Sequence, residues 1–422
     1  MPKDGLDTLS APARPAPHGG ARPSRGVWML GPALVAGVAY LDPGNVASNM
    51  TAGAKYGYLL VWVVVLANLI AWLVQYLSAK LGLVTGRSLP ELLGERIRRP
   101  WARRAYWLQA ELVAMATDVA EVIGGAVALQ LLFGLPLIWG GAITALVSLT
   151  LLVAQTRHGA RTFEFVIIGM VAIIAVGFVA GVFVAPPDVA GVAGGLVPRF
   201  EDSGSVLLAA SILGATVMPH AIYAHSALTR DRFSTDTTPI PRLLRATRWD
   251  VSLAMLIAGA VNVAILLLAA ANLAGVAGTD SLEGAYAALH TGVGPAIATL
   301  FAVGLLASGL ASTSVGAYAG AEIMHGLLHA RIPLLLRRLI SVLPALLLLG
   351  IGADPTRALV LSQVVLSFGI PFALIPLVSL TARGSVLGRF RNRVATTVLG
   401  AAASLALIVL NGMLLVLVAA EA

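Results

Sequence analysis

The sequence predicts an all-α polytopic membrane protein with eleven transmembrane helices, arranged as a five-plus-five inverted repeat in which helices 1 and 6 are broken. The first observation is composition: the 422 residues are 58% hydrophobic and only 11% charged, whereas soluble domains carry about 25% charged residues. The second is that apolar residues gather in runs long enough to span a bilayer. The third is that two of these runs contain a proline and polar residues near their middle, which is typical of inverted-repeat transporters.

Apolar runs of about 20 residues define the predicted spans. They cover residues 28–50, 57–80, 106–133, 137–154, 162–185, 205–228, 250–273, 292–327, 338–352, 357–380 and 394–419. Residues 1–26, rich in Pro, Ala, Gly and Arg, are expected to form a disordered cytoplasmic tail. Residues 27–393 form the transporter core, with the first repeat over 27–200 and the second over 201–393. Residues 394–422 add an eleventh helix and an extracellular C-terminus.

The basic residues predict the orientation of the spans. All Lys and Arg residues except Lys55, Arg199 and Arg357 fall in the tail or at alternate connections and span ends. Because short cytoplasmic loops carry the excess of Lys and Arg, we expect a multi-pass protein of the cell membrane with a cytoplasmic N-terminus and an extracellular C-terminus. The lipid bilayer is therefore a predicted partner. A nucleic acid is not, because the net charge of +8 is spread over short loops.

Several classes of function are disfavoured by what the sequence lacks. There is no cysteine, so disulfide bonds and thiolate metal ligands are both excluded. No His-Glu-x-x-His spacing occurs, which disfavours an intramembrane metalloenzyme, and no Gly-x-x-x-x-Gly-Lys loop occurs, which disfavours an ATP-driven pump. We therefore expect no enzymatic activity, no resident cofactor and no obligate protein partner.

The first span is interrupted at its middle by Asp42-Pro43-Gly44-Asn45. A carboxylate at membrane depth is costly and marks a functional site by default, and proline removes an amide donor and clashes with the preceding turn. Such a break persists in lipid where the freed backbone groups are buried in protein or line a polar cavity. We therefore predict that Asp42 to Asn45 form the unwound middle of a discontinuous helix. The alternative is a kinked helix without a function.

The sixth span is interrupted in the corresponding place by Met218-Pro219-His220. Substrate is expected near the membrane midplane, where the two breaks face each other. The available donors combine a carboxylate, a carboxamide, a thioether and two backbone carbonyls: Asp42, Asn45, Met218, Ala39 and Ala215. Oxygen ligands together with a thioether favour manganese, iron, cobalt or cadmium over magnesium and calcium. The alternative for Met218 is that it fills space in a core.

These two motifs resemble the paired signatures of the Nramp family of proton-coupled divalent-metal importers, and the similarity runs from about Gly31 to Arg393. Further stretches that carry it are Thr117-Asp118-Val119-Ala120-Glu121, Gly214-Ala215-Thr216, and Ser362-Gln363-Val364-Val365-Leu366-Ser367 followed by Pro371-Phe372-Ala373. The resemblance implies the fold of the bacterial leucine transporter and uptake of manganese or ferrous iron. It implies that the metal is bound by Asp42, Asn45, Met218 and the carbonyls of Ala39 and Ala215, with Gln363 joining in some conformations.

The sequence departs from the family pattern in two places. Leu310-Ala311-Ser312 stands where the family usually has Gln-Ser-Ser, and Gly369 stands where it usually has Gln. These differences spare the implied metal ligands and concern the outer gate or the details of coupling.

The third span carries three carboxylates. Glu111, Asp118 and Glu121 are spaced by seven and three residues, which places them on one helical face. Three carboxylates on one face of a spanning helix suit a proton wire. The alternative is a structural ion-pair network with Arg337 and Arg338 of the ninth span.

The resemblance implies a proton pathway that connects these groups to the metal site. In it, a proton accepted by Asp42 leaves through the acidic residues of the third span toward the paired arginines. His220 lies close enough to the second break to affect proton entry or gating. His225 is five residues further on and faces another direction, so we expect it to be structural.

Other intramembrane polar residues receive simpler interpretations. Asn68, Asn262 and Asn411 are expected to form hydrogen bonds between helices. Glu322 and His325 are three residues apart late in the eighth span, and a local hydrogen bond between them is preferred to a second metal site.

Two other transport functions stay open beside the import of a transition metal coupled to protons. A sodium-coupled symporter of an organic substrate such as an amino acid would offer a glycine-rich unwound turn to a carboxylate, whereas Asp42 is anionic and suits a cation. A magnesium transporter related to the Nramp family would lack the methionine that stands here as Met218. Manganese and iron accept the same ligands, so both remain candidate cargoes.

Overall fold

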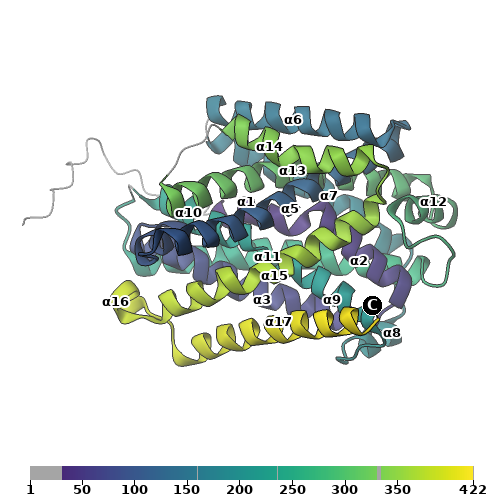
Figure 1. The fold of residues 1–422 in the computed structure, drawn as a ribbon. Coiled ribbons are helices and arrows are strands. Elements are labelled where there is room, and N and C mark those ends of the chain that lie inside the picture. Colours follow the sequence, from purple (N-terminus) through teal and green to yellow (C-terminus); the bar gives the residue numbers. More distant parts are fainter. Residues whose placement is uncertain (1–30, 159, 235, 330–333, 422) are drawn as a thin grey trace, which may run out of the picture.

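The computed structural model describes residues 31–158, 160–234, 236–329 and 334–421. The predicted disordered tail, residues 1–26, lies outside the described residues. Every regular element in the described ranges is a helix, and no strand occurs in them. The long helices run roughly alongside one another in a single bundle (Figure 1).

Each predicted span coincides with one helix or with helices separated by a break. The first span consists of α1 (Pro32–Gly37), the 3-10 helix η2 (Val38–Leu41) and α2 (Pro43–Tyr56), and the sixth consists of α9 (Ser203–Thr216) and α10 (Pro219–Phe233). The unbroken spans are α3 (Val61–Thr85), α5 (Pro100–Phe133), α6 (Leu137–His158), α7 (Ala160–Val184), α11 (Ile240–Asn272), α13 (Pro295–Leu328), α14 (Leu334–Gly350), α15 (Pro355–Ala382) and α17 (Val394–Glu421). The predicted all-helical class with broken first and sixth helices is confirmed.

The broken helices lie at the centre of the bundle. By length and composition, seven helices among the described residues could cross a membrane, and two shorter apolar stretches, Leu137–Thr150 and Ile168–Val184, accompany them. The most apolar window of Ser203–Phe233 is 94% buried inside the bundle, whereas that of Val394–Leu417 is 33% buried. Helix α17 therefore lies at the edge, as Figure 1 shows at the bottom of the view.

Short helices between the spans were not predicted from the sequence. They are α4 (Leu89–Arg96), α8 (Val189–Gly195), α12 (Leu282–Gly292), α16 (Gly384–Leu387) and the 3-10 turn η3 (Gly388–Phe390). Helix α4 begins with a capping box, in which Ser88 Oγ accepts from the Glu91 backbone N–H and Glu91 Oε2 accepts from the Ser88 N–H. A search for long apolar runs does not detect such elements, because they are defined by their caps.

The break in the first span is shorter and earlier than predicted. Helix α2 already begins at Pro43, so the prediction that Pro43, Gly44 and Asn45 are unwound is wrong. Proline is favoured at the first position of a helix, where its missing N–H would have no partner. The non-α-helical segment is instead η2 together with Asp42, whose backbone is extended.

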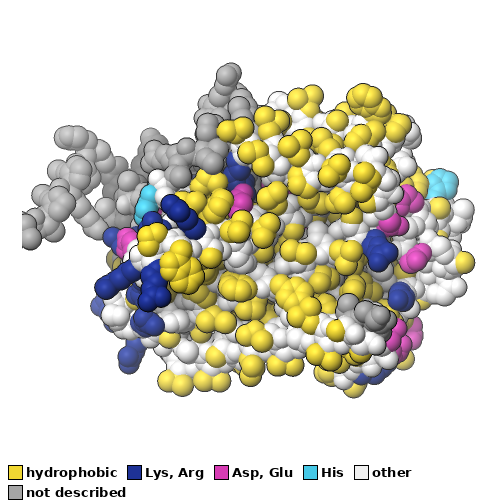
Figure 2. Space-filling view, viewed as in Figure 1, with side chains coloured by type: hydrophobic (Ala, Val, Ile, Leu, Met, Phe, Trp, Pro, Cys, Tyr) yellow, Lys and Arg dark blue, Asp and Glu magenta, His cyan; other side chains and the backbone are white. Residues whose placement is uncertain are grey.

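The surface of the bundle is divided by residue type. In Figure 2, hydrophobic side chains cover the middle of the visible face. Lys and Arg side chains gather at the end where α16 lies in Figure 1, and Asp and Glu are more frequent at the opposite end. This pattern matches a membrane-embedded belt with one basic end.

Candidate metal centre

Asp42 lies where the first span is broken. It is the N-cap of α2, and its Oδ1 accepts a hydrogen bond from the Asn45 backbone N–H at 2.7 Å. The side chain is fully buried, and its Oδ2 accepts from Gln363 Nε2 at 3.2 Å. Among the described residues Asp42 makes no ion pair, so only neutral donors stabilise its carboxylate.

Met218 occupies the corresponding place in the sixth span. Helix α9 ends at Thr216, and Met218 is the N-cap of α10, whose first residue is Pro219. Unlike Asp42, Met218 makes no capping hydrogen bond with its side chain, and it is fully buried. Its thioether is therefore a buried soft donor at the second break.

The two prolines explain why Ala39 and Ala215 are suitable carbonyl donors. In an α-helix a carbonyl accepts from the N–H four residues later. Four residues after Ala39 stands Pro43, and four residues after Ala215 stands Pro219, and proline has no N–H to donate. Both carbonyls therefore lose their α-helical partner, and both residues are fully buried.

Asn45 connects the two breaks. Its Nδ2 donates to the Tyr40 carbonyl at 2.7 Å and to the Ala215 carbonyl at 3.1 Å, across 170 residues of chain. Its Oδ1 accepts from Asn49 Nδ2 at 2.9 Å. The structure therefore brings Asn45 and Ala215 together as predicted, but they bond each other. For the Asn45 oxygen to face a metal beside the Ala215 carbonyl, the carboxamide has to rotate.

Gln363 of α15 contacts the carboxylate of Asp42. Its side chain is fully buried, Nε2 also lies 3.3 Å from Ser362 Oγ, and Oε1 has no hydrogen-bond partner among the described residues. The approach depends on glycines in both broken helices: a Cβ at Gly44 would collide with the Gln363 side chain, and one at Gly214 with the Gln363 carbonyl. Gly44 therefore leaves room for the Gln363 side chain of the neighbouring helix.

The donor set is unusual for a protein metal site. In the described part of the chain there is no group of three or more His, Cys, Asp or Glu residues that could hold a metal ion. Hydrogen bonds instead bring together the Asp42 carboxylate, the Asn45 and Gln363 carboxamides and the Ala215 carbonyl. The Met218 thioether and the Ala39 carbonyl are buried at the same two breaks. This combination of one negative charge, neutral oxygens and one soft sulfur suits a divalent transition ion better than magnesium.

The carboxylates on one face of α5 form ion pairs with Arg337 and Arg338. This network is the one that the sequence indicated as the alternative to a proton wire. Arg338 is 1% exposed and pairs with Asp118 and, at 3.2 Å, with Glu121 Oε2. Arg338 also donates to Ser148 and Thr313, each at 3.2 Å.

A second ion pair of the network, between Arg337 and Glu111, lies next to α13. Arg337 pairs with Glu111 at 3.0 Å. A Cβ at Gly320 of α13 would collide with the Arg337 guanidinium, so small residues on α13 provide the room for these charges. The partners of the three acids are those that the sequence named, while a role in proton transfer stays a prediction.

The network adjoins both breaks. His220 Nδ1 lies 3.2 Å from Thr117 Oγ1, the residue before Asp118. On the other side, a Cβ at Gly124 of α5 would collide with the ring of Pro43. Helix α5 therefore touches both sides of the centre within one turn of its acids. His225 is instead bonded to Gln75 at 2.5 Å, which agrees with the predicted structural role.

Some polar residues of this region were missed in the sequence. Thr216 Oγ1, next to the second break, is buried and has no hydrogen-bond partner among the described residues. Asp250 accepts from the backbone N–H groups of Gly31 and Ala33 at 3.1 and 2.9 Å and so caps α1. The acidic position of Asp250 at the inner end of the seventh span was a usable signal. Thr216 belongs to the Gly214-Ala215-Thr216 stretch that carries the family resemblance, but that stretch gave its side chain no role of its own.

The intramembrane asparagines follow the prediction in two cases of three. Asn262 donates to the Tyr40 carbonyl, and Asn411 donates to the Ser367 carbonyl on another helix. Asn68 bonds Val64 within its own helix, so the interhelical prediction is wrong there.

The local hydrogen bond expected between Glu322 and His325 is also absent. Glu322 pairs with Arg230 at 3.2 Å, and Arg230 also pairs with Glu91 at 2.8 Å. Burial alone would raise the pKa of Glu91, but its hydrogen bonds to the Ser88 backbone and to Arg230 outweigh burial and hold that pKa below its ordinary value.

Comparisons of the chain with known sequences identify its family and its relatives. The family described as Nramp, natural resistance-associated macrophage protein-like, matches residues 33–417. The chain is 62% identical over 393 residues to the divalent metal cation transporter MntH of Mycobacterium tuberculosis, covering 92% of this chain and 91% of that protein. It is 51% identical over 391 residues to the MntH of Deinococcus radiodurans, covering 92% and 89%.

Comparisons with solved structures add the fold. The manganese transporter of Eremococcus coleocola superposes with a TM-score of 0.80 at 32% identity, covering 92% of this chain and 85% of that one. MhsT, solved with L-phenylalanine, superposes with a TM-score of 0.61 at 12% identity, covering 94% and 98%. The second likeness shows the leucine-transporter-like fold alone.

Proposed function

Because the chain belongs to the Nramp family, we propose that it imports divalent transition-metal ions, manganese or ferrous iron, across the cell membrane in company with protons. The protein is a transporter and not an enzyme. The observation that carries the proposal is Asp42, a fully buried carboxylate at a helix break that makes no ion pair among the described residues. A buried negative charge of this kind is stabilised when a cation binds.

The donors around Asp42 support a transition metal as the cargo. Met218 adds a thioether, and Ala39 and Ala215 add carbonyls released by Pro43 and Pro219. Cobalt and cadmium accept the same kinds of ligand as manganese and iron. The relatives named as divalent metal cation or manganese transporters support the same assignment.

Alternating access is supported by the placement of the breaks. Discontinuous helices in two repeats allow one half of the bundle to rock about a fixed site. Helices α2 and α10 each begin at a break, and Figure 1 shows them toward opposite ends of the bundle. We infer that their movement opens the site to one side at a time.

Proton coupling is supported by the acidic face of α5. Asp118 follows Thr117, which contacts His220 at the second break, and Glu121 is three residues before Gly124, which packs against Pro43 at the first break. Arg338 binds Glu121. Asp42 can accept a proton when no metal is bound, because an uncompensated buried carboxylate favours its neutral form. Metal binding would expel that proton toward the α5 acids.

The basic residues support a cytoplasmic N-terminus. Arg383, Arg389, Arg391 and Arg393 are exposed at one end of the bundle, and Lys and Arg accumulate on the cytoplasmic side of membrane proteins. Import then proceeds toward this basic end.

A second candidate is a symporter of an organic substrate, because MhsT has the same fold. Such a carrier would bind the substrate carboxylate where Asp42 stands, and two buried anions would repel each other. Magnesium transport is disfavoured by the thioether of Met218, which magnesium does not prefer as a ligand.

The test is uptake of Mn²⁺ into proteoliposomes with the lumenal pH recorded by an enclosed dye. The wild type should take up Mn²⁺ and acidify the lumen. Asp118→Asn should lower metal-linked acidification by about tenfold or more, since a positioned proton carrier typically contributes about 10²–10⁴ to proton transfer. It should leave Mn²⁺ binding in calorimetric titration nearly unchanged, because Asp118 does not face the metal.

Glu95→Gln is the matched control. Glu95 is half exposed and pairs with Arg87 on the surface, so its removal should leave both quantities unchanged. Equal losses of binding and acidification in Asp118→Asn would make Asp118 structural. Absence of Mn²⁺ uptake by the wild type would favour the organic-substrate symporter.

A further inference from the structure

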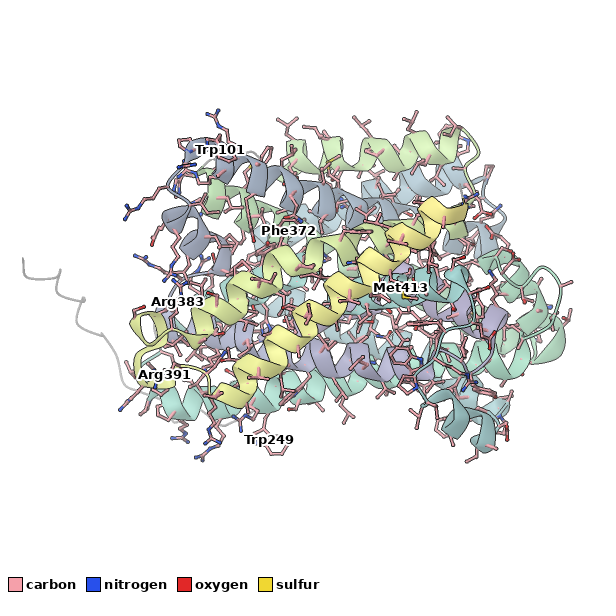
Figure 3. All side chains as sticks on the ribbon, turned by 60° about the horizontal axis from the view of Figure 1, so that its bottom comes forward. Trp101, Trp249, Phe372, Arg383, Arg391 and Met413 are labelled. Atoms are coloured by element: carbon pink, nitrogen blue, oxygen red, sulfur yellow. The ribbon has the colours of Figure 1, made fainter. Side chains whose placement is uncertain are left out.

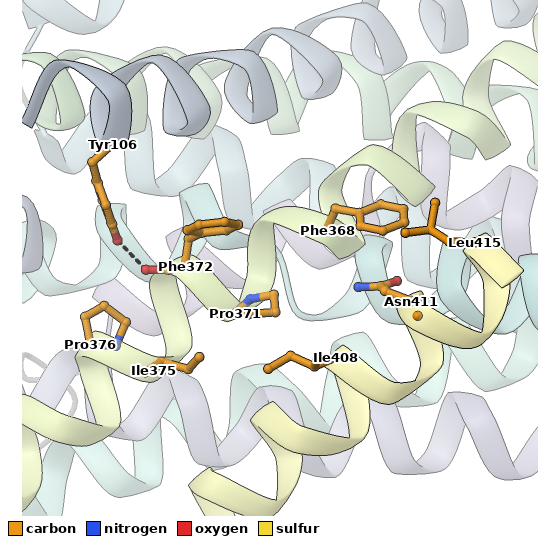
Figure 4. Close-up of a pocket in the computed structure, with 10 residues that line it drawn as sticks. Tyr106, Phe368, Pro371, Phe372, Ile375, Pro376, Ile408, Asn411 and Leu415 are labelled. Carbon is orange, nitrogen blue, oxygen red and sulfur yellow. Dashed lines mark hydrogen bonds between the residues drawn. The ribbon is translucent and has the colours of Figure 1, made fainter. Parts of the chain in front are cut away.

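A groove lies on the membrane-facing side of the bundle and begins on α15 at Phe368, five residues beyond Gln363 of the metal centre. It encloses about 570 Å³, within the range of about 300–1,000 Å³ that is common for small-ligand sites. The residues that line it come from α5, α15 and α17 (Figure 4): Tyr106, Phe368, Pro371, Phe372, Ile375, Pro376, Ile408, Asn411, Gly412 and Leu415. Phe372 and Leu415 are 50% and 59% exposed, so the groove is open to the side.

The polar groups of the groove are already bonded to each other. Pro371 and Pro376 have no N–H, so the carbonyls of Ser367 and Phe372 lose their helical donors. Asn411 Nδ2 donates to the Ser367 carbonyl at 3.0 Å, and the Tyr106 hydroxyl donates to the Phe372 carbonyl.

The remaining polar atoms are engaged too. Asn411 Oδ1 accepts from Ser367 Oγ at 2.7 Å, and the hydroxyls of Tyr106 and Tyr223 lie 3.0 Å apart. What the groove offers to an occupant is therefore hydrocarbon surface, which selects an apolar chain over a polar ligand.

The basic end of the bundle lies beyond the groove along α15. Figure 3 shows Arg383 and Arg391 beyond Phe372 at the end of α15 and before the start of α17, with Trp101 at the same end. Arg383 is eleven residues from Phe372, about 16 Å at the helical rise. Both arginines are exposed and make no ion pair among the described residues. Trp101 is 66% exposed and suits the membrane interface.

We propose that this groove holds one acyl chain of an anionic phospholipid of the cytoplasmic leaflet, whose phosphate binds Arg383 and Arg391. Clusters of basic residues just beyond a spanning helix attract anionic lipid headgroups. A second copy of the chain is a poorer occupant. Two copies in one membrane share an orientation, so a symmetric contact here would bring their arginine clusters together. The inference goes beyond metal transport and depends only on the proposed membrane orientation.

The bound chain would contact both proline turns of α15, on the cytoplasmic side of Gln363. The carbonyls released in these turns are held by Tyr106 and Asn411, which both line the groove. An acyl chain there shields these hydrogen bonds and supports the bend of the helix that also reaches Asp42.

The test fills the groove from α17. Gly412 lines the groove, and a Cβ there would meet no atom within 4 Å, so the side chain of Gly412→Phe starts from open space beside the groove. Gly169→Phe is the matched control, because Gly169 is an exposed glycine of α7 whose Cβ also meets no atom. The measurement is native mass spectrometry of the purified chain with phosphatidylglycerol or phosphatidylcholine of the same acyl chains. Gly412→Phe should lose the retained phosphatidylglycerol, and Gly169→Phe should retain it as the wild type does.

Arg383→Gln and Arg391→Gln test the headgroup. Each should lower the preference for phosphatidylglycerol over phosphatidylcholine by about fivefold, with the groove intact. Equal retention of both lipids by the wild type, or equal losses in Gly412→Phe and Gly169→Phe, would overturn the proposal. A dimer that only Gly412→Phe dissociates would show that a second copy occupies the groove. None of these results depends on Mn²⁺ uptake, so the two proposals can fail separately.

Discussion

Asp42 and Asp118 are both buried carboxylates in the middle of the bundle, at 0% and 1% exposure, but their surroundings differ. Asp118 pairs directly with Arg338. Asp42 is bonded to a backbone amide and a carboxamide. A buried charge with a fixed counter-ion is already satisfied, whereas one held by neutral dipoles alone stays costly until a cation or proton arrives. The difference fits the two proposed roles: Asp42 lacks a fixed counter-ion and is the proposed ligand of the cargo, whereas Asp118 has one and is the proposed proton carrier.

The dipoles around Asp42 are suited to this open role. As N-cap of α2 it lies at the positive end of a helix, which partly stabilises its charge. The Ala39 and Ala215 carbonyls come from the ends of the preceding helices, which carry partial negative charge. The helix N-terminus therefore partly stabilises the Asp42 carboxylate without a cation, while the negative charge and the carbonyls still attract one.

The largest expected effect comes from removing the fixed counter-ion. Arg338→Met leaves Asp118 and Glu121 buried without a cation, and loss of one partner of a buried pair costs about 3–5 kcal/mol. We expect a large fall in the thermal unfolding temperature of the purified protein at neutral pH. Arg337→Met is the matched control, because Arg337 is 6% exposed and its one ion pair among the described residues is with Glu111, so its loss should be smaller. Equal effects would mean that the inner pair is not special.

Removing the uncompensated charge should have the opposite sign. Asp42→Asn keeps an oxygen that can accept from the Asn45 amide but removes the buried charge, so at a pH at which Asp42 is ionised it should stabilise the metal-free protein by about 2 kcal/mol. The same change should abolish Mn²⁺ binding in calorimetric titration. A lower unfolding temperature for the metal-free Asp42→Asn protein would contradict the inference that the Asp42 carboxylate lacks a compensating positive charge.

The sequence predicted which acidic residues share a helical face better than it predicted where α2 begins. Glu111, Asp118 and Glu121 could be assigned to one face because helical spacing is regular, and their arginine partners were correctly named. The start of α2 was misplaced because Pro43 was interpreted only as a breaker, although Asp before Pro is also a favourable N-cap and first helical position.

Contacts that join distant segments could not be obtained in the same way. The hydrogen bond between Asn45 and the Ala215 carbonyl spans 170 residues, and that between Gln363 and Asp42 spans 321. They depend on the close approach permitted by Gly44 and Gly214, which periodicity does not reveal. The same reason explains Glu322, whose partner Arg230 lies on another helix.

The smallest expected effect comes from Met218, at the break in the sixth span. Met218→Ala removes the thioether, the soft donor of the proposed site, and leaves Asp42, whose charge provides most of the attraction, so Mn²⁺ uptake should persist. Discrimination against Ca²⁺ should fall by about tenfold, or 1.4 kcal/mol, measured as Mn²⁺ uptake into proteoliposomes with competing Ca²⁺. Met324→Ala, at a buried methionine of α13, controls for the loss of core volume and should leave selectivity unchanged. If Met218→Ala also leaves it unchanged, the thioether is no ligand and the centre selects its ion by the Asp42 charge and the carbonyls alone.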